Sequence, residues 1–261
     1  AIKHQAVLVE VRDGVSEEAK EIIEKVMERS AKGHNNALRS VSEEKREEYY
    51  FDKRSEKDSL PVDWSKLKKV KLLGGEPMVM EETIDVLNKL SEDCHLHLTT
   101  NAYKLSPEVE KALVKTKSKV QINLSIDGIK DTYNYIRVGS DWNQVEENIL
   151  KLKAYNKFEM SINPVAMMWN VFGLSELFEW CDTHEIRQKN LHWVGEKWNR
   201  IGLLSYEHKQ QLRHPKLDKF LSESFYNRNE LLSQWKDETN KKDLLRKTDI
   251  TKLDERFVDY L

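Results

Sequence analysis

Short runs of apolar and β-branched residues recur along the chain, and longer stretches with a helical pattern lie between them. A run of five to seven residues of this kind predicts a β-strand. Six such runs occur, at residues 6–11, 69–73, 96–100, 120–126, 160–166 and 190–194.

Amphipathic patterns between the runs predict helices at residues 16–30, 81–90, 142–152 and 174–183, and another that begins at Ser106. Ser16 and Ser106 are suited to cap a helix, and Pro107 suits a first helical position. Alternating strands and helices predict an α/β fold of parallel strands joined by right-handed helical crossovers.

Two segments depart from this alternation. Residues 39–59 form an almost continuous charge run, which predicts a solvated helix or a loop. After Val194 the chain becomes polar and mostly helical. We therefore predict a barrel-like domain at residues 1–194 and a helical C-terminal extension at residues 195–261.

Composition narrows the classes of protein to consider. The 261 residues are 39% hydrophobic and 34% charged, and 43 basic side chains face 45 acidic ones, for a net charge of -2. This balance gives no electrostatic signature for binding nucleic acid. No apolar run approaches the roughly 20 residues that a membrane helix needs, and no secretory signal is visible. We expect a cytoplasmic protein without a membrane partner.

Cysteine is rare in this chain. Cys94 and Cys181 are the two cysteines, and neither has a second cysteine close by in sequence. Each is interpreted as a small buried side chain, and we predict no metal site. Five aromatic residues of the second half are interpreted as packing in the core and under the extension: Trp169, Phe172, Trp180, Trp193 and Trp198.

The residues with the clearest chemical character follow three of the predicted strands. Gly74, Gly75, Glu76 and Pro77 follow the second strand. Two glycines let the backbone approach a ligand closely, and a glutamate can receive an ammonium group. Read alone, these four residues are equally consistent with an ordinary turn.

The third and fourth strands end in similar polar groups. Asn101 and Ala102 follow the third strand, and Ser125 and Asp127 lie at the end of the fourth. Asp127 can accept hydrogen bonds from ribose hydroxyls, or it can cap the next helix. The carboxyl ends of parallel barrel strands are where active sites form.

Taken together, the motifs GGEP, LTTNA, SIDG, YIR and WNQVEENI, in this order, resemble the radical S-adenosylmethionine (SAM) superfamily. The resemblance runs from about residue 63 to the end. It is closest to short members with a twitch-type C-terminal extension, common in bacteriophage and environmental sequences. It implies a partial (β/α)6, TIM-like barrel with a SAM-binding site.

The resemblance also implies roles for individual residues. Gly74, Gly75, Glu76 and Pro77 match the motif whose backbone and glutamate contact the methionine amino group of SAM. Asn101 matches the asparagine of a TNG turn, although Ala102 replaces the glycine. Ser125 and Asp127 match a motif associated with the ribose and methionine end, and Arg137 matches a carboxylate-binding arginine.

The departure from the family lies in its iron–sulfur site. The resemblance implies a [4Fe-4S] cluster held by C-x3-C-x2-C after the first strand, but residues 11–20 contain no cysteine. A second alignment places Ser30, His34 and Ala37 at that spacing. The sequence therefore does not support the cluster.

Three functional hypotheses follow. The first is a degenerate or loop-altered radical SAM-fold protein that keeps a SAM-like pocket and acts by binding. The second is a fragment or variant of an active radical SAM enzyme. The third is a non-catalytic interaction protein on the same barrel, with an unknown protein or peptide partner.

Overall fold

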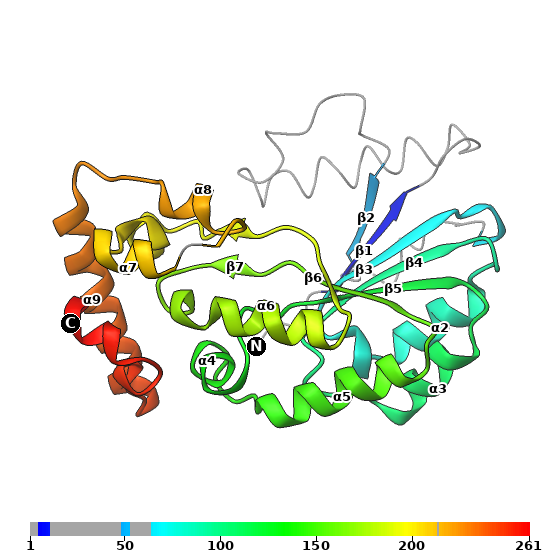
Figure 1. Ribbon diagram of the computed structural model, residues 1–261. Helices are drawn as coiled ribbons and strands as arrows, with labels where there is room; N and C mark the ends of the chain where they lie inside the picture. The colour runs from blue at the N-terminus through cyan, green and yellow to red at the C-terminus, as the bar shows by residue number, and fades with distance from the viewer. Residues whose placement is uncertain (1–4, 11–47, 53–63, 213) are drawn as a thin grey trace. The chain divides into compact units, whose positions relative to one another are not determined.

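The computed structural model describes residues 5–10, 48–52, 64–212 and 214–261 (Figure 1). The chain divides into two compact units, and each is described by itself. The first unit comprises Ala1–Thr100, Lys104–Asn123 and Lys151–Glu159, and the second comprises Asn101–Tyr103, Leu124–Leu150 and Met160–Leu261.

The first unit is built on a sheet whose strands follow the order β2-β1-β3-β4-β5. These strands are β1 (Gln5–Glu10), β2 (Glu48–Asp52), β3 (Lys69–Gly74), β4 (His95–Thr100) and β5 (Lys119–Leu124). The alternate residues of β4 and β5 are buried, as the two-residue period of a strand requires. The helical elements are η2 (Trp64–Lys66), η3 (Pro77–Val79), α2 (Glu81–Lys89) and α3 (Pro107–Lys115).

The first strand does not run as predicted. Strand β1 pairs antiparallel with β3, so that Gln5 lies opposite Gly74 and Glu10 lies opposite Lys69. Strand β1 therefore ends beside the start of β3, which corrects our expectation that the first strand runs parallel to the others. Residues 11–20, where the resemblance places the cluster motif, lie outside the described residues. The pattern of apolar residues does not indicate the direction of a strand, and mixed sheets with an antiparallel edge are common.

Strand β2 corrects a second expectation. It lies within the charge run at residues 39–59, which we expected to be a helix or loop, and it pairs antiparallel with β1 from Glu48 to Asp52. Its sequence, EYYFD, holds three consecutive aromatic residues, which favour a strand more strongly than the flanking charges oppose one.

The second unit contains β6 (Glu159–Ile162), which pairs in parallel with β8 (Arg187–Gln188). A separate two-stranded parallel sheet joins β7 (Val165–Ala166) to β9 (His192–Trp193). The predicted fifth strand, residues 160–166, is thus split at Pro164, which has no backbone N–H for a sheet. The predicted sixth strand belongs to the small sheet, and β8 takes its expected place.

Helices account for the rest of the second unit. They are α4 (Lys130–Ile136), α5 (Trp142–Ala154), η4 (Val171–Gly173), α6 (Leu174–Thr183), η5 (Lys197–Asn199), η6 (Ile201–Leu203), α7 (Tyr206–Gln211), α8 (Asp218–Leu221), α9 (Arg228–Arg246), η7 (Ile250–Lys252) and η8 (Glu255–Tyr260). The last part of the chain is held by a buried aromatic cluster, in which the Trp235 and Phe257 rings stack 6.1 Å apart.

The helix predictions are confirmed at four places, α2, α3, α5 and α6. Ser106 caps α3, since its hydroxyl accepts a hydrogen bond from the Val109 N–H at 3.3 Å. Helix α4 was not predicted. The predicted helix at residues 16–30 lies outside the described residues, as do Ser30, His34 and Ala37.

The expected α/β fold of parallel strands and connecting helices is confirmed, and among the described residues the larger sheet has five parallel strands where six were expected. This arrangement is consistent with a partial (β/α)6 barrel. Among the described residues, no helix combines the length and the apolar character needed to cross a membrane.

Candidate functional site

The glycine-rich turn after β3 has a backbone that requires glycine. Gly75 has φ of +60°, in the left-handed region that side chains disfavour. A Cβ atom at Gly75 would also lie 2.9 Å from the sulfur of Met80, so the space is occupied. The turn thus exposes backbone polar groups directly after the carboxyl end of β3.

Glu76 fixes the direction in which the chain leaves this turn. Its Oε1 accepts a hydrogen bond from the Met78 N–H at 3.1 Å and so caps η3, whose first residue is the buried Pro77. The hydroxyl of Thr100, the last residue of β4, also donates to Glu76 Oε1. The carboxylate therefore links the carboxyl ends of two neighbouring parallel strands, β3 and β4.

The turn formed by residues 101–103 has an alanine, Ala102, at the position where the resemblance leads us to expect a glycine. Ala102 has φ of 55°, so an alanine occupies the left-handed conformation that glycine normally takes, at a cost of about 1–2 kcal/mol. Asn101 Oδ1 accepts a hydrogen bond from the Tyr103 N–H at 2.9 Å. Buried Asn148 of α5 donates to the carbonyls of Ala102 (2.9 Å) and Tyr103 (3.1 Å).

Asp127 is a buried centre of hydrogen bonds in the second unit. Its Oδ2 accepts from Arg137 Nη2 at 2.9 Å, and its Oδ1 accepts from the Val165 N–H at 2.9 Å. Its carbonyl accepts from Asn170 Nδ2 at 2.6 Å. Asp127 does not cap α4, because the N-cap residue there is Ile129 and no side chain caps it. Ser125 lies part-exposed two residues earlier.

Arg137 pairs with Asp127 inside the protein and also reaches solvent. About a third of its side chain is exposed (31%), against 11% for Asp127, and its Nε is buried without a hydrogen-bond partner. A carboxylate ligand would meet a guanidinium already oriented by Asp127.

The predicted site residues thus fall into two sets. Gly74 to Pro77 belong to the first unit, whereas Asn101, Ser125, Asp127 and Arg137 belong to the second. Within the second set the structure brings Asp127 and Arg137 together. The assignment of all eight residues to a ligand stays a prediction.

Three further residues shape these sets and were missed by sequence reasoning: Thr100, Asn148 and Asn170. Asn148 had a detectable signal, because it occupies the apolar stripe of α5 beside Val145, Ile149 and Leu152, which are all buried. A polar residue on a buried helix face must be hydrogen-bonded.

The cysteines do not fit an iron–sulfur cluster. A cluster of the family's type needs three converging thiolates, and the sequence holds two cysteines. Both are fully buried and lie in different units. Burial raises the pKa of Cys94 to about 11 and that of Cys181 to about 12. In the described part of the chain, no group of three His, Cys, Asp or Glu side chains could hold a metal ion.

Part of the chain matches the profile of a known protein family. Residues 48–171 match the sequence profile of the Radical SAM superfamily. The match begins at the first residue of β2 and covers just under half of the chain. No curated protein matches the chain.

Several solved structures are similar over part of the chain. SuiB of Streptococcus suis, solved with the precursor peptide SuiA, is 22% identical with a TM-score of 0.43, over 49% of this chain and 29% of SuiB. Native anSMEcpe, solved with AdoMet and a peptide, is 19% identical with a TM-score of 0.42, over 67% of this chain and 48% of that protein. The chain spans less than half the length of these proteins.

Proposed function

We propose that the chain binds SAM and does so without a [4Fe-4S] cluster of its own, since residues 48–171 match the profile of the Radical SAM superfamily. The observation that carries the proposal is the Gly75–Glu76 turn, where a left-handed glycine precedes a carboxylate fixed between the ends of β3 and β4.

The residues of this turn suit the amino end of an amino acid moiety. The Glu76 carboxylate and the exposed backbone of Gly75 suit an ammonium group. SAM supplies an activated sulfonium when bound, and Gly75 and Glu76 would bind and orient its methionine amino group. Without iron to chelate the methionine end, we expect affinity between about tens of micromolar and millimolar, or roughly 4–6 kcal/mol.

Calorimetry of the purified chain with SAM tests the proposal. We expect saturable binding that weakens at least about tenfold, or about 1.4 kcal/mol, in Glu76→Gln, because a neutral amide loses the ionic attraction to the ammonium group. Glu81→Gln is the matched control, since Glu81 is an exposed glutamate in the first turn of α2 and should bind normally.

A second pair of variants separates binding from folding. Gly75→Ala should weaken SAM binding because the added Cβ strains the turn and displaces Met80. Gly139→Ala introduces the same left-handed strain at φ of 82°, where no atom lies within 4 Å, and should leave binding unchanged. No saturation by SAM up to several millimolar, or equal affinity in Glu76→Gln, contradicts the proposal.

Anaerobic reconstitution with iron and sulfide tests the cluster. We expect the protein to stay colourless, because two buried thiols with raised pKa values cannot hold iron. A brown product that absorbs near about 400 nm would instead favour a variant of an active radical SAM enzyme.

A further inference from the structure

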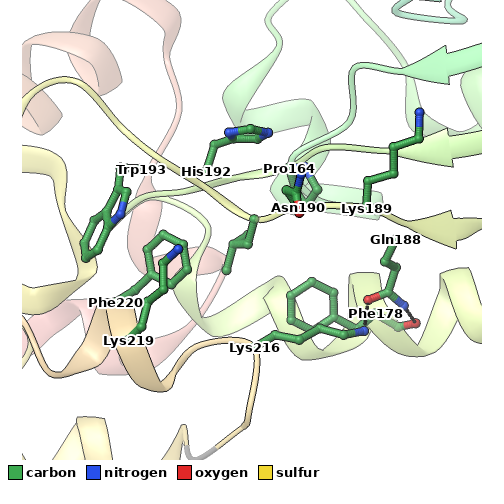
Figure 2. A pocket seen from close by; sticks show the side chains of 11 residues that line it. Pro164, Phe178, Gln188, Lys189, Asn190, His192, Trp193, Lys216, Lys219 and Phe220 are labelled. Carbon is green, nitrogen blue, oxygen red and sulfur yellow. Dashed lines mark hydrogen bonds between the residues drawn. The ribbon is translucent and has the colours of Figure 1, made fainter. Parts of the chain in front are cut away.

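A pocket of about 430 Å³ is lined entirely by residues of the second unit (Figure 2). None of the eight predicted SAM-site residues lines it. It opens where β6 and β8 end, since Pro164 follows β6 and Lys189 follows β8 directly. Eleven described residues line it: Pro164, Phe178, Gln188, Lys189, Asn190, Leu191, His192, Trp193, Lys216, Lys219 and Phe220. Crevices at the carboxyl ends of parallel strands are the usual ligand sites of α/β proteins.

One end of the pocket is aromatic. The rings of Trp193 and Phe220 lie 4.3 Å apart, and Figure 2 shows them together at the same end. Phe220 is buried, whereas Trp193 is 38% exposed, so Trp193 keeps surface for a ligand. Strand β9 holds Trp193 by pairing it with Ala166 of β7, and the Arg200 guanidinium lies 5.4 Å from its ring. Trp193 therefore packs against the predicted extension through Phe220, as expected, and keeps part of its surface exposed.

The pocket is also cationic. Lys216 Nζ lies 4.9 Å from the centre of the Phe178 ring, and Lys219 Nζ lies 5.0 Å from that of Phe220. Lys216 also donates to Gln188 Oε1, and Gln188 Nε2 in turn donates to the Phe178 carbonyl at 2.9 Å. Two exposed ammonium groups thus lie against aromatic rings of the lining.

The eleven lining residues include no acidic side chain, and Lys189 and His192 add further basic groups. The exposed carboxylate of Asp182, which does not line the pocket, accepts a hydrogen bond from Gln188 at 2.8 Å. An anion is the ligand charge that this lining favours.

We propose that this pocket binds a nucleoside phosphate, with the base against Trp193 and the phosphate at Lys216. A planar ring can stack on the exposed indole, an anion can accept a hydrogen bond from the Lys216 ammonium group, and Lys219 adds positive charge to the lining. The volume lies within the range of about 300–1,000 Å³ typical of small-molecule sites. SAM carries a positive sulfonium, so this ligand is of a different class from that of the Gly75–Glu76 turn.

Titration of the full chain with AMP, followed by tryptophan fluorescence and calorimetry, tests the pocket. We expect AMP to bind at least about tenfold more tightly than either adenosine or inorganic phosphate, because only AMP engages both ends of the pocket. Binding should weaken as salt is raised, since the lysines are exposed.

Variants assign the binding to these residues. The double variant Lys216→Gln, Lys219→Gln and the single variant Trp193→Leu should each weaken AMP binding at least about tenfold. Lys236→Gln and Tyr226→Leu are matched controls, because both side chains are exposed outside the pocket, and they should bind AMP normally. Thermal melting of every variant identifies any that fails to fold. The variants that do fold then show whether these residues bind AMP.

The two ligand sites are distinguished by crossing the variants. Glu76→Gln should leave AMP affinity unchanged, and the double lysine variant should leave SAM affinity unchanged. Absence of saturation by AMP at several millimolar overturns the proposal, as does AMP binding that the double lysine variant retains. Equal binding of benzoate and AMP also overturns it, because the pocket would then take aromatic anions without selecting a nucleotide.

Discussion

At the scale of single residues, a buried lysine of the second unit has a strongly shifted pKa. Lys242 of α9 is 6% exposed, and its Nζ lies 3.8 Å from the ring centres of both Tyr135 and Trp169. Burial, with a smaller contribution from the Arg246 charge, lowers the pKa of Lys242 to about 7, and Asp243 opposes both effects. Removing an ammonium group from water outweighs its attraction to the rings.

This residue predicts a pH dependence of stability. In the unfolded chain Lys242 regains an ordinary pKa near 10.5, so between about pH 7 and 10.5 the unfolded state binds more protons. The free energy of unfolding should therefore rise with pH across this window, by on the order of a few kcal/mol. Urea denaturation at several pH values measures the slope.

Lys242→Met provides the control for this prediction. Methionine keeps an unbranched apolar chain against the two rings but does not titrate. The variant should be more stable than the parent at pH 7 and should lose the rise between pH 7 and 10.5. A slope that persists unchanged in Lys242→Met would assign the effect to other groups.

At the scale of elements, one side chain connects a helix to a turn. Asn148 lies on the buried stripe of α5 and donates to two carbonyls of the turn at residues 101–103, where Ala102 holds a left-handed conformation. Local sequence preference does not favour alanine in that conformation. The turn therefore depends on α5 for its shape.

Asn148→Ala should lower the free energy of unfolding by about 1–3 kcal/mol, because two carbonyls lose a buried donor. Asn143→Ala on the same helix is the control, since its side chain is exposed, and it should change stability by less than about 0.5 kcal/mol. Chemical denaturation of both variants gives the comparison. Equal effects of the two substitutions would show that Asn148 does not support the turn.

At the scale of the whole molecule, the two cysteines report on the two units separately. Cys94 belongs to the first unit and Cys181 to the second, and both are fully buried. Burial raises the pKa of both thiols, to about 11 and about 12. A thiol that is both inaccessible and protonated reacts only when its surroundings open.

Labelling with a thiol reagent at pH 8 should therefore be at least about 100-fold slower in the native protein than in denaturant. Cys94→Ala and Cys181→Ala each leave a single thiol, so the rate in each variant measures the opening of one unit. Rapid native labelling of either thiol would contradict its burial. Identical rates across a urea series would indicate that the two units open together.

Much of this protein was predictable from local pattern. Helix α6 was predicted to the residue at Leu174–Thr183, and Ser106 and Pro107 marked the start of α3, because caps and apolar stripes are properties of neighbouring residues. The GGEP motif likewise identified a turn after β3. The predicted cytoplasmic location stays a prediction.

Strand direction, partner choice and the surroundings of a side chain were decided only by the tertiary structure. The apolar pattern of β1 reads the same in either direction, and its pairing with β3 made it antiparallel. The sequence left open whether Asp127 caps α4, and the structure instead brings Arg137 and the Val165 N–H to its two oxygens. Trp193 resembled the other tryptophans until strand pairing placed it at a pocket. Sequence fixes what each residue can bond to, and long-range packing selects which partner it meets.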